Sequence, residues 1–197
     1  IRGNIGLGIT YHGSTSVLTQ CYDHRHTLIE ASDSDFSHSG RKSNSSVSIL
    51  LNGGAIYHSS RRQSTVSLNS GEAEVKAAAL LAELLSSVVP LWSELLGSSP
   101  PPIRCLIDNK AAKKQLESGV ESSASASYLK PKRYCESKIY AGLMWLDYVP
   151  GKENFADLGT KQVRDTTEFL YKNDILTGAK PYMFETEEVT RILTKKL

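Results

Sequence analysis

The sequence predicts an α/β domain built on a mixed five-stranded sheet flanked by helices. One observation is the order of the patterns along the chain, which run strand, strand, strand, helix, strand, helix, helix, strand, helix. Another is the segment 103–107, whose apolar side chains fall on both parities, as in a central strand that is covered on both faces. Three antiparallel strands, extended by two strands that follow helical crossovers, give such a sheet.

The first three strands are expected over 27–35, 47–51 and 55–59. The segment Asn52-Gly53-Gly54 has the chemistry of a tight hairpin turn. Because strands that follow one another in sequence usually pair, we expect an antiparallel meander. A shorter run, 7–11, also fits a strand.

The longest helical pattern runs from Ser70 to about Leu96. Ser70 has the side chain of an N-cap, and Pro90 is expected to kink or break the helix. The remaining predicted elements are helices over 111–117 and 131–145, a strand over 147–149, a helix containing Asp157, and one or two helices within 164–197.

The composition sets broad limits on function. The chain has 197 residues, 40% of them hydrophobic, which suffices for one packed core. Its formal net charge of +2 is too small to indicate a nucleic-acid partner by itself. The three cysteines form no CxxC pair, so neither a disulfide framework nor a zinc cluster is expected, and a reducing, intracellular setting is the default.

No apolar run approaches the roughly 20 residues of a membrane span, so no membrane partner is expected. No signal peptide is visible. Because the chain begins with Ile1 rather than Met, we expect it to be a part of a longer protein.

Asp108 lies at the carboxyl end of the buried fourth strand, where α/β sheets usually bind ligands. Helical geometry places Glu74 on the apolar stripe of the long helix, and Glu72 on the opposite, solvated side. A buried carboxylate needs a cation or hydrogen-bond donors, so Glu74 either helps to form a site or reaches an arginine or a backbone amide. Asp33 and Asp35 share one face of the first strand, and strand parity does not choose between them.

Taken together, the acids of the first strand, the long helix, the fourth strand and the last helix can converge. Convergent carboxylates bind hard divalent cations, and two ions about 4 Å apart suit phosphodiester hydrolysis. Taken singly, the first-strand acids also fit turn capping, and Asp157 fits a surface acid.

Several blocks resemble the ribonuclease H domain of copia-type LTR retrotransposon polyproteins. The blocks are Asp33–Asp35 with Arg41-Lys42-Ser43, Gly53–Glu74, Ile107–Ala111, Tyr148–Lys161, and Arg2–Tyr11, which is similar to the tail of the preceding reverse-transcriptase connection. The likeness covers about residues 2–163. It implies a connection tail over 1–26 and a domain of ribonuclease H-like fold over 27–163. Residues 164–197 have no strong match and are expected to form a C-terminal helical extension.

The resemblance also implies a function and its residues. The metal-binding and catalytic residues would be Asp33, Glu74, Asp108 and Asp157, with Asp33 chosen over Asp35. They would hold two Mg²⁺ or Mn²⁺ ions and hydrolyse the RNA strand of an RNA–DNA hybrid during reverse transcription. The implied partner is the reverse-transcriptase domain of the same polyprotein, and the implied location is the cytoplasm, in a virus-like particle, with the nucleus as a second site.

Two departures from related sequences are visible. Leu158-Gly159 replaces a larger apolar pair, and the glycine is expected to loosen that helix. Cellular ribonucleases H usually carry a histidine on the loop before the last aspartate, whereas this loop is Pro150-Gly151-Lys152-Glu153. We therefore expect slow turnover.

Several basic and polar side chains could bind the hybrid. Their contacts with its phosphates would determine the binding affinity and would not depend on the base sequence. The substrate-binding candidates are Asn109, Arg61, Arg62, Lys110, Lys132 and Arg133. The alternatives are ordinary solvated faces for the basic residues and helix capping for Asn109.

Two other functions fit the same fold. One is a catalytically weak, ribonuclease H-like domain kept for hybrid binding or scaffolding, which the presence of all four acids disfavours. The other is a DDE-type transposase or integrase, which the position of Glu74 before the Asp108 strand disfavours.

Overall fold

Five strands form one sheet in the computed structural model, which describes residues 8–11, 28–37, 41–97, 99–119, 127–180 and 182. The strands are β1 (Leu28–Asp35), β2 (Asn44–Leu51), β3 (Gly54–Arg62), β4 (Ile103–Ile107) and β5 (Met144–Tyr148), in the spatial order β3-β2-β1-β4-β5. β3, β2 and β1 pair antiparallel, while β4 pairs parallel with both β1 and β5. The predicted mixed sheet is confirmed.

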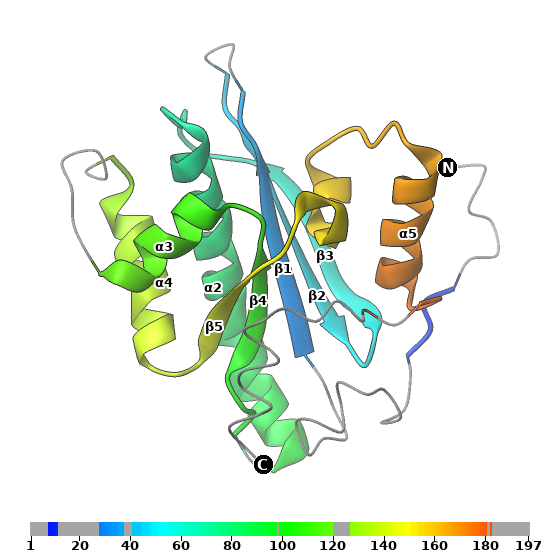
Figure 1. Ribbon diagram of the computed structural model, residues 1–197. Coiled ribbons are helices and arrows are strands. Elements are labelled where there is room, and N and C mark those ends of the chain that lie inside the picture. Colours follow the sequence, from blue (N-terminus) through cyan, green and yellow to red (C-terminus); the bar gives the residue numbers. More distant parts are fainter. Residues whose placement is uncertain are drawn as a thin grey trace.

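The helices cover both faces of this sheet (Figure 1). They are α2 (Ser70–Leu96), α3 (Lys110–Ser118), α4 (Leu129–Tyr140) and α5 (Thr166–Thr177), with two 3₁₀ helices, η3 (Gly151–Glu153) and η4 (Phe155–Gly159). One core contains residues of α2, α3 and α4 packed on the sheet. The second core lies on the opposite face and contains Phe155 and Ala156 of η4 and Ile175 of α5.

The β2–β3 hairpin has the predicted turn. Asn52 and Gly53 connect the strands with φ values of 49° and 83°. Two consecutive positive φ angles are what a type I′ turn requires, and an Asn-Gly pair adopts them at low cost.

α2 is one continuous helix from Ser70 to Leu96 with Pro90 inside it, so Pro90 does not break the helix, and the alternative of a kink stays a prediction. Its N-cap is Asn69 rather than Ser70, because the Asn69 side chain accepts a hydrogen bond of 2.8 Å from the backbone N–H of Glu72. By length and composition alone α2 could cross a membrane, which differs from the sequence expectation. Its buried Val75, Leu81 and Leu85 instead form the center of the larger core.

Two more boundaries differ from the sequence prediction. α4 ends at Tyr140, and Met144 and Trp145 belong to β5 rather than to the helix. The reason is a turn at Gly142, which has a φ of 67°, followed by pairing of Met144 with Ile103 of β4. The described part of the predicted strand 7–11 has no regular structure, although the Thr10 N–H donates to the Thr177 carbonyl.

The C-terminal segment packs on the sheet through α5. Ile175 is fully buried, and Leu176 packs against the same core. Phe169 and Leu170 remain 39% and 51% exposed. α5 is one of the one or two helices predicted within 164–197, and the residues after Tyr182 lie outside the described part of the chain.

Gly159 at the end of η4 packs directly on β2. A Cβ atom at Gly159 would lie 2.2 Å from Ser46 Oγ and 2.7 Å from Ser46 Cβ. The Ser60 hydroxyl also donates a hydrogen bond to the Gly159 carbonyl. The glycine therefore permits close approach of η4 to the sheet. The sequence analysis expected Gly159 to loosen this helix, whereas in the structure it makes a close contact with β2.

Replacing Gly159 by Ala is expected to destabilise the protein by about 1–3 kcal/mol, because the added methyl overlaps Ser46. Urea unfolding followed by circular dichroism measures this change. Adding Ser46→Gly should restore part of the loss, and Gly8→Ala, with open space around it, serves as the control. Equal stability of Gly159→Ala and the wild type would contradict the proposed contact.

Candidate active site

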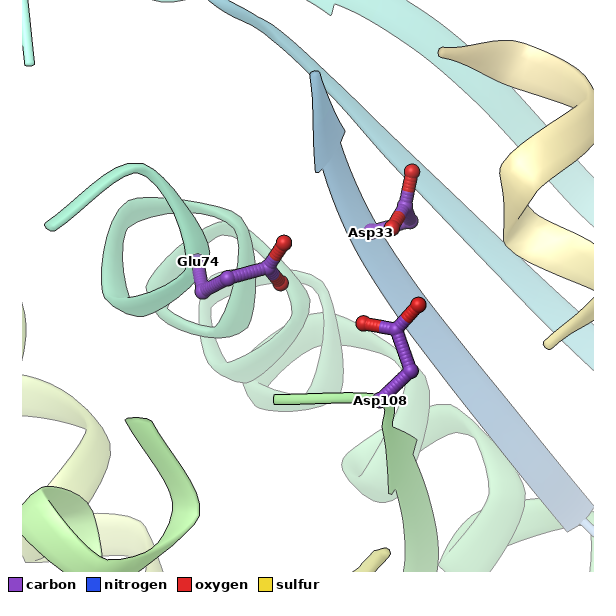
Figure 2. Close-up of side chains that lie close together, drawn as sticks. All are labelled: Asp33, Glu74 and Asp108. Carbon is purple, nitrogen blue, oxygen red and sulfur yellow. The ribbon is translucent and has the colours of Figure 1, made fainter. Parts of the chain in front are cut away.

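Three carboxylates from separate elements meet at one edge of the sheet. Asp33 of β1, Glu74 of α2 and Asp108 after β4 each offer an oxygen, and these oxygens lie within 4.8 Å of one another. Figure 2 shows the three side chains pointing toward a shared space. The predicted convergence of these acids is therefore present in the structure.

The pairing of β1 with β4 brings two of these acids together. In this parallel pair Ala31 lies opposite Leu106. Continuing the register by two residues places Asp33 opposite Asp108, at the carboxyl ends of both strands. Ligand sites of α/β sheets form at this edge.

Glu74 reaches the same edge from the first turns of α2. The Ser34 hydroxyl of β1 donates a hydrogen bond of 2.9 Å to Glu74 Oε1. The other carboxylate oxygen, Glu74 Oε2, is buried and has no hydrogen-bond partner among the described residues. A buried carboxylate oxygen without a donor is costly, and a bound cation would satisfy it.

Gln63 fixes the start of α2 against the sheet, a role that the sequence analysis missed. Its Nε2 donates hydrogen bonds of 2.9 Å to Ser45 Oγ of β2 and to the Ala73 carbonyl, next to Glu74. Its Oε1 accepts a hydrogen bond of 2.7 Å from the Ser67 hydroxyl. Only the position of Gln63 between β3 and the helix start could have suggested this role.

Burial makes ionisation of the three acids unfavorable. Burial, with the nearby Asp157 and Asp108, raises the pKa of Asp33 to about 7, although Lys161 opposes the shift. Burial, with Asp33 and Asp108, raises the pKa of Glu74 to about 9. Burial likewise raises the pKa of Asp108. Three carboxyls that resist ionisation together are a fitting ligand set for a hard divalent cation, which would offset their charge.

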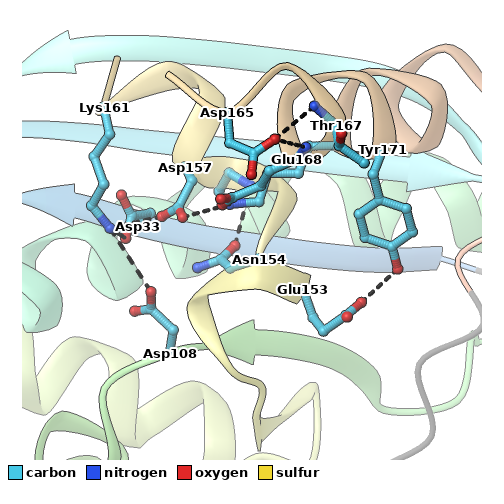
Figure 3. A network of polar contacts seen from close by, with 12 residues as sticks. Asp33, Asp108, Glu153, Asn154, Asp157, Lys161, Asp165, Thr167, Glu168 and Tyr171 are labelled. Atoms are coloured by element: carbon cyan, nitrogen blue, oxygen red, sulfur yellow. Dashed lines mark hydrogen bonds and ion pairs between the residues drawn. The ribbon is translucent and has the colours of Figure 1, made fainter. Parts of the chain in front are cut away.

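Asp157 lies beside this group, on η4, but has different partners. Its Oδ1 is 2.8 Å from Lys161 Nζ, and its Oδ2 is 2.7 Å from Lys172 Nζ. Lys161 Nζ also lies 3.2 Å from Asp33 Oδ1 and 4.0 Å from Asp108 Oδ2. Figure 3 shows Lys161 between these acids. The fourth predicted ligand is therefore joined to Asp33 and Asp108 through a lysine.

Asn154 holds η4 in place, which the sequence analysis also missed. Its Nδ2 donates a hydrogen bond of 3.0 Å to the Ser32 carbonyl of β1, and its Oδ1 accepts one of 3.1 Å from the Ala156 N–H. The Thr160 hydroxyl adds a hydrogen bond to Asp33 Oδ2. Asp157 is thus positioned by direct contacts between η4 and the strand that carries Asp33.

Glu72 is buried rather than solvated as predicted. It is 2% exposed, accepts a hydrogen bond of 3.0 Å from the Leu68 N–H and pairs with Lys76 at 2.8 Å. The Ser127 hydroxyl also donates to it, at 3.1 Å. The segments before α2 and α4 cover this side of the helix, which helical periodicity alone does not reveal.

Lys132, predicted to bind substrate, is 1% exposed and forms an ion pair with Glu136. The prediction that Lys132 binds substrate was therefore wrong, because the packing of α4 turns this side chain inward, where it cannot contact phosphates. Arg133, Arg61, Arg62 and Lys110 are exposed. The Lys110 ammonium lies 4.6 Å from the center of the Tyr148 ring.

Asn109 caps α3, since its Oδ1 accepts a hydrogen bond of 3.0 Å from the Ala112 N–H. This is the alternative role considered for it, and a contact with a hybrid stays a prediction.

Arg61, Arg62 and Lys130 line a groove of about 980 Å³ between β3, α2 and α4. Gln63 lies in the same groove, which therefore borders the helix start that carries Glu74.

Solved structures of ribonucleases H have the same arrangement of elements. LC11-RNase H1, isolated from compost by a metagenomic approach, is 15% identical, with a TM-score of 0.53 over 68% of this chain and 92% of its own. RNase H1 of the archaeon Halobacterium salinarum is 16% identical, with a TM-score of 0.50 over 68% of this chain and 94% of its own. The N-terminal RNase H domain of a Mycobacterium tuberculosis protein is 13% identical, with a TM-score of 0.51 over 68% of this chain and 90% of its own.

The chain has the ribonuclease H fold. No protein-family model matches the sequence, and no curated protein matches it. At 13–16% identity the likeness to the solved ribonucleases H establishes the fold, and the chemistry rests on the acids themselves.

The raised pKa of Glu74 gives this ribonuclease H fold a pH-dependent stability. Without metal, the folded state binds the Glu74 proton more tightly than the unfolded state, so stability falls as pH rises from about 4.5 through about 9. Glu74→Gln removes this loss and should melt at a higher temperature than the wild type at pH 9 in EDTA. The difference should shrink at pH 5. Differential scanning calorimetry measures it, with the exposed Glu83→Gln as control, and a difference independent of pH would contradict the assignment.

Proposed function

We propose that this protein is a metal-dependent endonuclease that hydrolyses the RNA strand of RNA–DNA hybrids. The observation that carries the proposal is the group of Asp33, Glu74 and Asp108, which meet within 4.8 Å at the carboxyl edge of a ribonuclease H-type sheet. The buried, unpartnered Glu74 Oε2 supports a cation at this place. A solved structure of LC11-RNase H1, 16% identical to this chain, is a complex with an RNA/DNA hybrid.

The three acids would hold a Mg²⁺ or Mn²⁺ ion through oxygen, the ligand type that both ions prefer. When bound, such an ion polarises a phosphoryl oxygen and lowers the pKa of its water. The chain itself positions the carboxylates through the β1–β4 register, the Ser34 hydrogen bond and the Gln63 contacts. A second ion, as the family resemblance implies, would require Asp157 to exchange its lysine partners for a metal.

The groove lined by Arg61, Arg62 and Lys130, which also contains Gln63, supports binding of a polyanion next to the start of α2. Contacts with phosphates would position the hybrid, while helix shape and the 2′-hydroxyl would distinguish RNA from DNA. Asn109 at the start of α3 and Lys110 next to it are the proposed contacts on the other side of Asp108.

We further propose that the domain acts in reverse transcription of a copia-type retrotransposon. The support is the series of sequence blocks from Gly53 to Glu74 and from Tyr148 to Lys161. In this setting the partner is the reverse-transcriptase domain of the same polyprotein, and the location is a cytoplasmic virus-like particle, with the nucleus as a second site.

A weakly active, hybrid-binding domain is the second candidate. The observation that favors it is the Lys161 ammonium among Asp33, Asp108 and Asp157, where it competes with cations. This candidate predicts tight hybrid binding with little cleavage in either metal.

Cleavage of a labelled RNA–DNA hybrid in Mg²⁺ or Mn²⁺ tests the proposed enzyme. Asp108→Asn should lower the cleavage rate at least about a hundredfold, because a metal ligand contributes several kcal/mol of transition-state stabilisation. The matched control is Asp174→Asn, which replaces an acid that pairs with Lys180 away from the proposed ligands. Absence of cleavage by the wild type in both metals, or equal rates for Asp108→Asn, would refute the enzyme.

Arg61→Ala is expected to weaken hybrid binding and to reduce the slope of log affinity against log salt by about 1, since one phosphate contact is lost. Fluorescence anisotropy on the Asp108→Asn background measures binding without cleavage. Lys180→Ala removes the same charge outside the groove and should leave the slope unchanged. A slope unaffected by Arg61→Ala would place the hybrid elsewhere.

A further inference from the structure

Asp157 uses both of its carboxylate oxygens for ion pairs with lysines. Oδ1 lies 2.8 Å from Lys161 Nζ, and Oδ2 lies 2.7 Å from Lys172 Nζ. Lys161 comes from the turn after η4 and Lys172 from α5, so the two ammonium groups approach from different elements. A carboxylate in this state has little capacity left for a metal ion.

Lys172 makes this arrangement difficult to undo. Its side chain is completely buried, and its ammonium contacts Asp157 and, at 2.7 Å, Glu168. If Asp157 turned to a metal, Lys172 would keep only Glu168 while remaining buried. Removing one of the two partners of a buried ammonium is destabilising, because a single carboxylate then has to compensate its charge.

Lys161 places a positive charge beside the metal-binding acids. Its Nζ lies 2.8 Å from Asp157 Oδ1 and 3.2 Å from Asp33 Oδ1, and it approaches Asp108 Oδ2 to 4.0 Å. Burial alone would lower the pKa of Lys161, but Asp33 and Asp157 outweigh it and raise that pKa. The contacts with Asp157 and Asp33 therefore hold the Lys161 ammonium at the edge of the acid group.

We propose that Lys161 takes the place of a second metal ion, and that the site binds one divalent cation through Asp33, Glu74 and Asp108. In this arrangement Asp157 is a positioning residue, which anchors Lys161 on one oxygen while Lys172 holds the other. This inference rests on the proposed function for its role in hydrolysis, but the number of bound ions is measurable without a substrate.

The charges of the site agree with this assignment. Asp33, Glu74, Asp108, Asp157 and the half-buried Glu168 carry five negative charges when ionised, and Lys161 and Lys172 offset two of them. One divalent ion then offsets two more, including the charge of Glu74 with its unpartnered Oε2. A second divalent ion would have to lie next to the Lys161 ammonium, where like charges repel.

Counting of bound Mn²⁺ tests the proposal. The free protein is titrated with Mn²⁺ at pH 8, and unbound Mn²⁺ is measured by its electron paramagnetic resonance signal. The wild type should bind one ion per chain, and Asp108→Asn should bind it at least about tenfold more weakly, as for loss of one ligand. Two wild-type ions of comparable affinity would overturn the proposal.

The Lys161 variants separate charge from structure. Lys161→Met keeps the length of the side chain but removes its charge, and should allow a second Mn²⁺ ion to bind. Lys161→Arg keeps the charge and should still bind one ion, as should the control Lys180→Met. Binding of only one ion by a Lys161→Met protein with wild-type circular dichroism would also overturn the proposal.

Asp157 is tested in a background that does not leave Lys172 unpaired. The double variant Asp157→Asn with Lys172→Met should keep the affinity of the first ion within about threefold, whereas loss of a true ligand costs about tenfold or more. A larger loss would make Asp157 a ligand and overturn its anchoring role.

The hybrid cleavage assay keeps this inference apart from the proposed function. If the wild type binds one ion but does not cleave the hybrid, the single-ion site is supported and the proposed nuclease activity is refuted. If the wild type cleaves the hybrid and binds two ions, the nuclease activity is supported and the single-ion site is refuted.

Discussion

The parallel pairing of β1 with β4 is the constraint on which the rest of the site depends. This register sets Asp33 opposite Asp108 at the carboxyl ends of both strands, and Glu74 and Lys161 lie next to that pair. α2 adds Glu74, and Gln63 fixes the first turn of this helix to the sheet. η4 adds Asp157 because Asn154 ties it to the backbone of β1. A shift of one residue between β1 and β4 would turn one acid to the other face and abolish the group.

The site resolves the cost of burying four carboxyls in two different ways. On the α2 side, Asp33 and Glu74 have raised pKa values, so they favor a proton or a cation from outside. On the α5 side, Asp157 is balanced from within by the ammonium groups of Lys161 and Lys172. The charges of Asp33 and Glu74 are therefore compensated less within the protein than the charge of Asp157. This difference underlies the separate roles that we propose for these acids.

The sequence predicted the sheet, the hairpin turn and the convergence of three acids, because these depend on local patterns and chain order. Helical periodicity placed Glu74 correctly but put Glu72 in solvent, because it does not show the loops that cover Glu72. Lys132 was assigned to the substrate from the set of basic residues alone, which does not show that the packing of α4 buries it. The lysine partners of Asp157 could not be predicted from the sequence for a related reason. Lys172 lies fifteen residues away on a helix with no clear motif, and only its tertiary packing brings its ammonium to Oδ2.

The position of Lys172 also bears on where the functional unit ends. The family resemblance stops near residue 163, yet the buried lysine that holds Asp157 belongs to α5, and Ile175 of the same helix completes the second core. Asp157, next to the three acids of the candidate site, would lose its inner partner if α5 were absent. Because unpaired charge is costly at such depth, α5 contributes to the electrostatics of the candidate site as well as to packing. The part of the chain that builds the candidate site thus extends into α5, past the point at which the sequence likeness ends.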